Sequence, residues 1–351
     1  MKIRFVRKLQ VNDVVAKDIL SGEGKTLIKQ GIKITRQSIK FLRENLILYI
    51  YIEDEALNDI QTDPVLDNLK QKTLAKLPRI FGSIYTGNYT DARQDLESVD
   101  ELINHIFEKK WVNTNMYEIK TYDNYTYIHC LDTSIMVAFI GLEMKYEKSK
   151  LRDLCIAAIL HDIGKIKIPN NILNKKSKLT DEEFELIKMH SVYGKEILEK
   201  VPFCTESIIQ GVYQHHERID GKGYPTRTYD DEIGEFAKII SICDVFTAVS
   251  ANRSYRQRFS PNDAYELILA GSGTKFDEGM VQKFRNVFFI YPLGACVKLT
   301  NGVEGYVVRQ NKFFADRPVV RIIYDVNTQQ KVDIYEINLL EHPNIAVESI
   351  I

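Results

Sequence analysis

The sequence predicts a mainly α protein with a helical core, a small α/β segment at the N-terminus and a small β-barrel at the C-terminus. Apolar side chains recur at helical spacing from about residue 57 to residue 287. Strand-like runs rich in β-branched and aromatic residues flank this region on both sides. We therefore expect three domains, at 1–56, 57–287 and 288–351, with residues 57–115 forming a helical lead-in to the core.

The N-terminal segment mixes strands with one helix. The run TLIKQG, residues 26–31, is typical of a strand that enters a turn. Thr35 is a suitable N-cap for a helix that continues through Leu42. The run ILYIYI, residues 47–52, has the composition of a strand. Together these signals indicate a small α/β domain.

Helix-start signals recur in the central region. Thr180 with Glu183 three residues later forms a capping box, and we expect His190 on the helix that Thr180 begins. Ser260-Pro261 indicates another helix, with proline at its first position.

The C-terminal segment carries a hairpin signal. Asn301-Gly302 lies between two strand-like runs and suits a type I′ turn. Residues 317–325 and 331–339 are predicted to be further strands. These strands are the basis for expecting a small barrel.

Composition excludes several classes of protein. Of the 351 residues, 44% are hydrophobic and 27% charged, as in soluble globular proteins. The net charge of −1 gives no indication of a DNA- or RNA-polymer binder or of a membrane-surface protein. The five cysteines are dispersed, which favours reduced thiols in the cytosol. No apolar run is long enough to span a bilayer, and the first ten residues lack the apolar region of a signal peptide. We expect a cytoplasmic protein.

Histidines and aspartates form a series in the central region. Its members are His129, the pair His161-Asp162, His190, the pair His215-His216, and Asp244. Imidazole and carboxylate are the ligands that iron, manganese, nickel and zinc accept. A lone His-Asp pair is more often a buried hydrogen-bonded pair, but the whole series offers more ligands than one metal needs. Asp244, inside an apolar helix, would be costly to bury unless it were paired or bound to metal. We therefore expect at least two metal ions, used for hydrolysis.

Two longer motifs carry a resemblance. HDIGKIKIP (161–169) and HHERIDGKGYP (215–225), with His190 and Asp244 at fitting positions, resemble the HD-GYP domain, a branch of the HD phosphohydrolases, from about residue 100 to 287. The resemblance implies a helical domain with a bimetallic or trimetallic centre, often of iron or manganese. It also implies hydrolysis of cyclic di-GMP to pGpG or GMP, and some members act on cyclic GMP-AMP.

The resemblance assigns roles to individual residues. It makes the seven residues of the His/Asp series the metal ligands, with Asp162 bridging and also catalytic. Lys165 would face the scissile phosphate, although an ordinary loop lysine would look the same. Gly223, Tyr224 and Pro225 match the GYP loop, and Arg253 and Arg256 match positions that hold substrate, so all five are expected to bind substrate with Lys165. A charged helix end would also account for the two arginines. Members with three metals carry Glu where this chain has Tyr125, so we expect two ions.

The residues and the resemblance lead to one mechanism. A hydroxide shared by two metals would attack phosphorus in line with the leaving 3′ oxygen, and Lys165 would offset charge in the transition state. A receptor that binds cyclic dinucleotides with weak or no turnover is the alternative. A di-iron oxygenase is a third and weaker one, since the GYP loop and arginine pair suit a phosphate-bearing substrate. A homodimer, or a signalling partner bound through the terminal domains, is left open.

Overall fold

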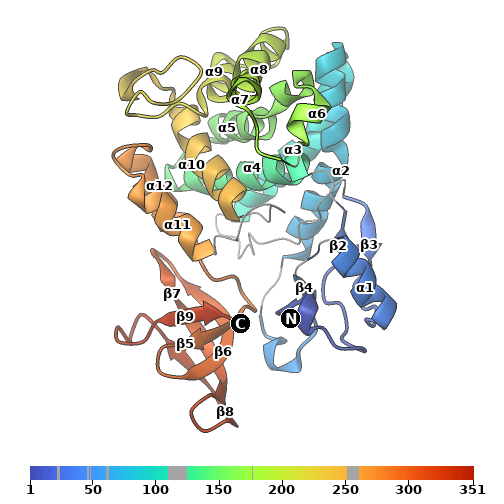
Figure 1. The fold of residues 1–351 in the computed structure, drawn as a ribbon, viewed down its shortest axis with the longest axis vertical. Coiled ribbons are helices and arrows are strands. Elements are labelled where there is room, and N and C mark those ends of the chain that lie inside the picture. The colour runs from blue at the N-terminus through green and yellow to red at the C-terminus, as the bar shows by residue number, and fades with distance from the viewer. Residues whose placement is uncertain are drawn as a thin grey trace. The chain divides into compact units, whose positions relative to one another are not determined.

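The structure is a computed structural model that describes residues 1–21, 24–45, 47, 49–60, 63–109, 125–175, 177–250 and 261–351. The described residues divide into two compact units (Figure 1). Unit 1 contains those within 1–64 and 285–351 together with residue 125, and unit 2 contains those within 65–109 and 126–284. No helix in the described part of the chain is long and apolar enough to cross a membrane.

Unit 2 is helical, as the periodicity predicts. Its α-helices are α2 (Pro64–Thr86), α3 (Tyr89–Lys109), α4 (Tyr125–Glu143), α5 (Lys148–Leu160), α6 (Asn170–Leu173), α7 (Asp181–Lys188), α8 (His190–Leu198), α9 (Glu206–Gln214), α10 (Glu235–Ser250), α11 (Pro261–Ala270) and α12 (Glu278–Val287). Two 3₁₀ helices, η3 (Ile163–Lys167) and η4 (Asp230–Glu232), connect them. The predicted starts at Thr180 and Pro261 are confirmed.

The capping box at Thr180 is present in both directions. The Thr180 hydroxyl accepts a hydrogen bond from the Glu183 amide at 3.2 Å, and the Glu183 carboxylate accepts one from the Thr180 amide at 2.8 Å. The prediction that this helix continues through His190 is wrong. Helix α7 ends at Lys188, the chain turns at Met189, and His190 opens α8. This turn places the His190 carbonyl against the backbone of Gly164, where a methyl group would overlap it.

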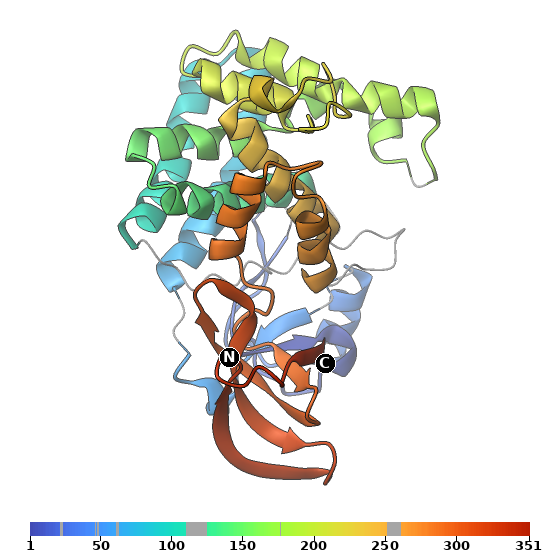
Figure 2. The same cartoon turned by 90° about the vertical axis from the view of Figure 1, so that its left-hand side faces the viewer.

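Unit 1 combines both ends of the chain. The N-terminal part holds β1 (Lys2–Phe5), η1 (Val6–Lys8), β2 (Ile19–Leu20), β3 (Thr26–Ile28), α1 (Arg36–Glu44), β4 (Tyr49–Ile52) and η2 (Glu55–Leu57). Strand β1 pairs with β4 and β2 with β3, both antiparallel. The C-terminal part holds β5 (Cys296–Leu299), β6 (Val303–Asn311), β7 (Phe314–Asp325), β8 (Gln330–Asn338) and β9 (Val347–Ile350). These form one antiparallel sheet in the order β8-β7-β6-β5-β9. Figure 2 shows these strands in orange and red.

The hairpin at Asn301-Gly302 is confirmed, but its turn type is not the predicted one. A type I′ turn needs positive φ at both central residues, and Asn301 is not among the residues with positive φ. The Gly302 amide instead donates to the Leu299 carbonyl at 3.0 Å, and Gly302 has φ +84°. A three-residue loop ending in a left-handed glycine accounts for this geometry. Closure of the five-stranded sheet into a barrel stays a prediction.

The two ends of the chain hydrogen-bond to each other within unit 1, although they were expected as separate domains. The Ile3 amide donates to the Gly294 carbonyl at 2.9 Å. The Arg321 guanidinium donates to both Asp59 carboxylate oxygens, at 2.7 and 2.6 Å, and to the Ala56 carbonyl at 2.7 Å. Bidentate guanidinium–carboxylate bonds are directional, so they orient β7 relative to the segment that follows η2.

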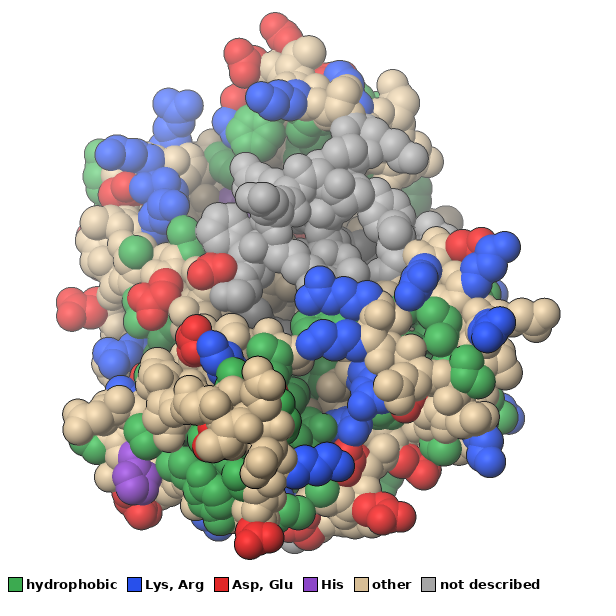
Figure 3. Space-filling view, turned by 60° about the horizontal axis from the view of Figure 1, so that its bottom comes forward, with side chains coloured by type: hydrophobic (Ala, Val, Ile, Leu, Met, Phe, Trp, Pro, Cys, Tyr) green, Lys and Arg blue, Asp and Glu red, His purple; other side chains and the backbone are tan. Residues whose placement is uncertain are grey.

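Charge is unevenly distributed along the chain. Residues 1–45 contain eleven lysines and arginines against four aspartates and glutamates, although the whole chain has a net charge of −1. Figure 3 shows a face of the molecule on which Lys and Arg side chains gather. The near-neutral total therefore does not describe the local surface.

Candidate metal centre

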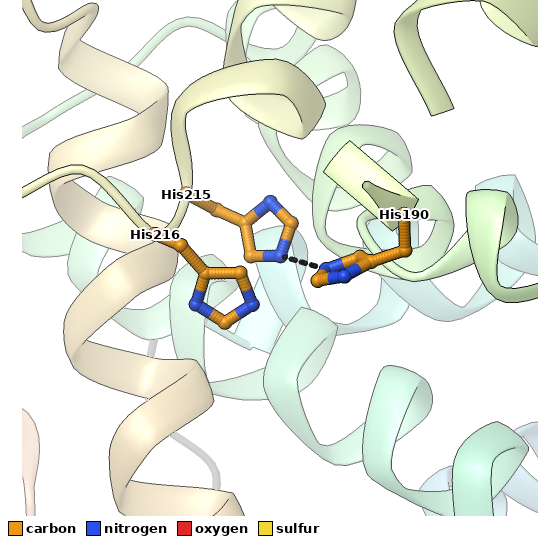
Figure 4. A group of neighbouring side chains, drawn as sticks. All are labelled: His190, His215 and His216. Atoms are coloured by element: carbon orange, nitrogen blue, oxygen red, sulfur yellow. Dashed lines mark hydrogen bonds between the residues drawn. The ribbon is translucent and has the colours of Figure 1, made fainter. Parts of the chain in front are cut away.

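Five segments of unit 2 bring the predicted ligands together. His129 lies on α4, His161 and Asp162 follow α5, and His190 begins α8. His215 and His216 follow α9, and Asp244 lies within α10. Their ligand atoms fall into three groups, each within 4.8 Å: His190, His215 and His216 (Figure 4); His129, His161 and Asp162; and His161, His215 and Asp244.

The cluster is buried in an apolar helical core. All residues from Leu154 to Leu160 on α5 are buried, and this helix delivers His161 and Asp162, which are 0% and 2% exposed. Of the seven residues, His216 is the most open, with 23% of its side chain exposed. Burying so many polar groups is costly unless they are paired or bind ions.

Three of the histidines are oriented by the same backbone hydrogen bond. The Nδ1 atoms of His161, His190 and His215 each lie 2.7 Å from the carbonyl oxygen three residues earlier. A carbonyl only accepts, so each Nδ1 carries the proton. The opposite atom, Nε2, then presents a lone pair to the interior of the cluster, the arrangement typical of metal-binding histidines.

One of the resulting contacts places acceptor against acceptor. His190 Nε2 and His215 Nε2 lie 3.2 Å apart (Figure 4), and both are lone-pair atoms. His129 Nδ1 lies 3.1 Å from the Thr247 hydroxyl, while its Nε2 lies 2.9 Å from Asp244 Oδ1. The buried Nε2 of His161 has no hydrogen-bond partner among the described residues. A cation would compensate the facing lone pairs and the unpartnered Nε2 of His161, so the donor set fits a divalent metal ion.

Asp162 faces two histidines with different oxygens. Its Oδ2 lies 3.5 Å from His161 Nε2, and its Oδ1 lies 3.6 Å from His190 Nε2. These histidines belong to different ligand groups. The carboxylate therefore faces members of two ligand groups.

Burial sets the protonation of the ligands. It lowers the pKa of His129, His190 and His215, and it lowers that of His216 to about 3. These imidazoles are therefore neutral near pH 7, the form that binds metal. Burial opposes ionisation of Asp162, but Lys165 and nearby histidines hold the pKa of its carboxyl well below the usual range.

Lys165 lies at the edge of the cluster. Its Nζ is 2.5 Å from Asp162 Oδ2, and 27% of its side chain is exposed. Burial works against its charge, but Asp162 outweighs burial and raises the pKa of Lys165. A cation thus lies beside the ligand cluster.

The predicted GYP loop lies against His216. The Tyr224 amide donates to the His216 carbonyl at 3.2 Å, and the two rings have centroids 4.6 Å apart. A side chain at Gly223 would come within 2.6 Å of the backbone at residues 216–218, so the close approach requires glycine. Pro225 follows Tyr224 through a cis peptide bond. Glu217, which also holds this loop, was not singled out from the sequence, although it directly follows the histidine pair.

Two predicted substrate residues, Arg253 and Arg256, lie outside the residues that the structure describes, as does the side chain of Tyr125. Their roles stay predictions.

Comparisons with known proteins agree with this geometry. A family model described as HD domain matches residues 108–280. The cyclic di-GMP phosphodiesterase PA4108 of Pseudomonas aeruginosa is 29% identical over 271 residues, which are 76% of this chain and 65% of that protein. The 3'3'-cGAMP-specific phosphodiesterase 2 of Vibrio cholerae is 36% identical over 127 residues, which are 36% of this chain and 24% of that protein. The chain thus spans less than two thirds of either curated relative.

A solved structure shows the same fold. Bd1817, an HDG"Y"P protein from Bdellovibrio bacteriovorus, matches 80% of this chain and 97% of its own with a TM-score of 0.53 at 16% identity. The family match, the named relatives and this fold agree with the HD and GYP motifs at residues 161–162 and 223–225. Residues 108–280 of this chain therefore match the HD-domain family.

Proposed function

We propose that this chain is a metal-dependent phosphodiesterase that hydrolyses cyclic di-GMP. The observation that carries the proposal is the buried cluster of acceptor atoms on both sides of Asp162, with Lys165 beside it. The relative from Pseudomonas aeruginosa bears the name of a cyclic di-GMP phosphodiesterase, which supports this choice of substrate. The Vibrio cholerae relative makes 3'3'-cGAMP the second candidate substrate.

Two ions, of iron or manganese, would be held on either side of Asp162. His190, His215 and His216 form one set of ligands, and His129, His161 and Asp244 contribute to the other. When bound, divalent ions polarise a phosphoryl oxygen and lower the pKa of water, which supplies the nucleophile for hydrolysis. The neutral imidazoles and ionised carboxylates of this chain are already in the protonation states that such ions require.

Lys165 and the GYP loop would act on the substrate. The Lys165 ammonium would donate to phosphoryl oxygens as negative charge develops on them. Gly223, Tyr224 and Pro225 form the loop that borders His216, the most open of the ligands. Burial raises the pKa of Tyr224, so its hydroxyl stays protonated and is able to donate a hydrogen bond. Arg253 and Arg256 are proposed to hold the phosphates of the substrate.

The test separates an enzyme from a receptor. Protein purified without oxygen is analysed for metal, incubated with cyclic di-GMP, pGpG or 3'3'-cGAMP, and its products are separated by chromatography. We expect two ions per chain and conversion of cyclic di-GMP to pGpG or GMP. Tight binding of the dinucleotide with full metal content and no product would instead establish the receptor.

A pair of lysine variants tests the site itself. Lys165→Ala should keep its metal but lose about 100- to 1000-fold in turnover, as when other charge-stabilising groups are removed. Lys167 belongs to the same 3₁₀ helix but pairs with Glu196 at 2.7 Å, so Lys167→Ala is a matched control that should keep its activity. Equal turnover in the two variants would show that Lys165 is an ordinary loop lysine.

The arginine pair needs a binding measurement. Replacing Arg253 and Arg256 together with Ala should weaken cyclic di-GMP binding without changing the metal content, because guanidinium groups bind phosphate in bidentate fashion. Rising salt should weaken binding to the wild type more than to the double variant. Unchanged affinity would remove both residues from the proposed site.

A further inference from the structure

His216 lacks the Nδ1 hydrogen bond to a backbone carbonyl that orients His161, His190 and His215. Its Nδ1 faces Asp244 Oδ2 at 3.7 Å, which is beyond hydrogen-bonding distance. No backbone carbonyl in the described part of the chain accepts from either nitrogen of His216. With 23% of the side chain exposed, burial alone does not restrain this ring.

Stacking takes the place of that hydrogen bond. The His216 ring contacts the ring of His215, at a centroid distance of 4.0 Å and an interplanar angle of 42°, and that of Tyr224, at 4.6 Å and 31°. The His190 ring meets it edge to face at 5.0 Å. His215 is itself held by its Nδ1 bond to the Val212 carbonyl. The orientation of His216 therefore also depends on the contacts that fix the position of the Tyr224 ring.

Glu217 holds the loop that carries Tyr224. Its side chain is 4% exposed, and Oε1 accepts hydrogen bonds from the Thr226 amide at 2.7 Å, the Thr226 hydroxyl at 2.8 Å and the Arg227 amide at 3.1 Å. Arg227 has φ +58°, a left-handed conformation that a residue other than glycine keeps only when its surroundings impose it. One carboxylate oxygen thus ties the end of the loop to its beginning.

The loop is also closed at its centre. Gly223 packs against the backbone at residues 216–218, and the Tyr224 amide bonds to the His216 carbonyl. Together with the hydrogen bonds to Glu217, these contacts place the Tyr224 ring against His216.

We propose that Glu217 is a positioning residue that orients His216 for metal binding by holding Tyr224 against it. The inference rests on the proposed role of His216 as a ligand. Removing a group that orients a metal ligand typically weakens metal affinity about 10- to 100-fold, and we expect an effect of this size. Glutamine keeps one oxygen acceptor and should preserve most of the function, whereas alanine leaves three donors without their partner.

The experiment measures metal release from the full chain, with no nucleotide present. Protein loaded with Mn²⁺ is mixed with excess chelator, and the rate of ion release is followed together with thermal unfolding. Glu217→Ala should release one of its two ions about 10- to 100-fold faster than the wild type. Glu217→Gln should stay close to the wild type, and Glu232→Ala, on exposed η4, is the control that should not change.

A second pair of variants, at Tyr224, tests the same inference even if Glu217→Ala does not fold. Tyr224→Phe retains the aromatic ring and should release its ions like the wild type, whereas Tyr224→Leu should behave like Glu217→Ala. Wild-type release rates in both Glu217→Ala and Tyr224→Leu would overturn the inference and leave the proposed function standing. A wild-type protein that binds no Mn²⁺ or Fe²⁺ would overturn both.

Discussion

The two units of this chain bury their interiors in opposite ways. In unit 1, nine aliphatic side chains that pack around α1 and β4 form a buried cluster: Val6, Leu9, Val15, Ile19, Ile34, Leu42, Ile47, Ile50 and Ile52. In unit 2, the interior holds buried imidazoles and carboxylates, and the lone-pair atoms of His190 and His215 face each other. The aliphatic cluster is stabilised by its burial alone, whereas the polar cluster would be compensated by the cations that it could hold.

The contrast between the aliphatic and the polar interior indicates which unit carries the functional site. An aliphatic interior gains free energy with every apolar group removed from water, so it needs no ligand. A polar interior lowers stability unless its charges are compensated, and such a cost is retained where the groups have a task. Substitutions in the two clusters should therefore have different consequences, and this contrast can be tested.

The largest expected effect is that of Asp162→Ala. The variant removes the carboxylate whose two oxygens face His161 and His190. We expect loss of most bound metal and a fall in turnover of at least about 1000-fold, comparable to losing a principal charge-stabilising group. Metal analysis and product chromatography measure both, and circular dichroism should show that the helices remain.

The control for this variant is Asp153→Ala. Asp153 lies on α5, the helix that leads to Asp162, and its carboxylate accepts an exposed hydrogen bond from the Thr205 hydroxyl. It should keep both metal and activity. Full metal occupancy and turnover in Asp162→Ala would end the assignment of this cluster as a metal centre.

Leu42→Ala, in the aliphatic cluster, should lower stability and leave metal content and turnover unchanged. Leu42 is 0% exposed, and truncating such a leucine costs about 2–5 kcal/mol of unfolding free energy. Denaturant unfolding measures this loss. Metal content and turnover per folded molecule should not change, and a loss of metal from the folded variant would refute the contrast between the clusters.

Gly164→Ala tests the packing that positions His190. A methyl group at this position would overlap the His190 carbonyl and lie 2.6 Å from the Gly194 amide nitrogen. Overpacking of this kind costs about 1–3 kcal/mol, and the displaced His190 should also weaken metal binding. Gly82→Ala on α2 is the matched control, because nothing lies within 4 Å of its added methyl, and it should stabilise the helix by up to about 1 kcal/mol. Equal unfolding free energies in the two variants would contradict this account.

The smallest expected effect is a dependence of stability on pH in metal-free protein. The lowered pKa values of His129, His190, His215 and His216 mean that the folded chain resists protonation there, while the unfolded chain takes up protons below about pH 6.5. Stability should therefore fall as the pH decreases from 7 towards 5. Leu42→Ala should shift this curve down without changing its slope, since that cluster contains no titratable side chain. A flat curve for metal-free protein would show that these imidazoles are not buried in neutral form.

Local signals determined much of this protein from the sequence alone. The capping box at Thr180, the proline start at Pro261 and the Asn301-Gly302 hairpin depend on residues a few positions apart, and the structure contains each of them. The order of the histidine and aspartate residues and the two long motifs identified the domain. These patterns survive in sequence because helix caps, turns and adjacent ligand pairs are made by neighbours in the chain.

Tertiary structure decided what those residues do to one another. No spacing in the sequence shows that the two Asp162 oxygens face different histidines, that three Nδ1 atoms donate to backbone carbonyls, or that Glu217 closes the loop under Tyr224. The break between α7 and α8 and the left-handed Gly302 likewise escaped the local rules. These features come from contacts between helices and loops distant in sequence, where packing sets the direction of each side chain and the position of each proton.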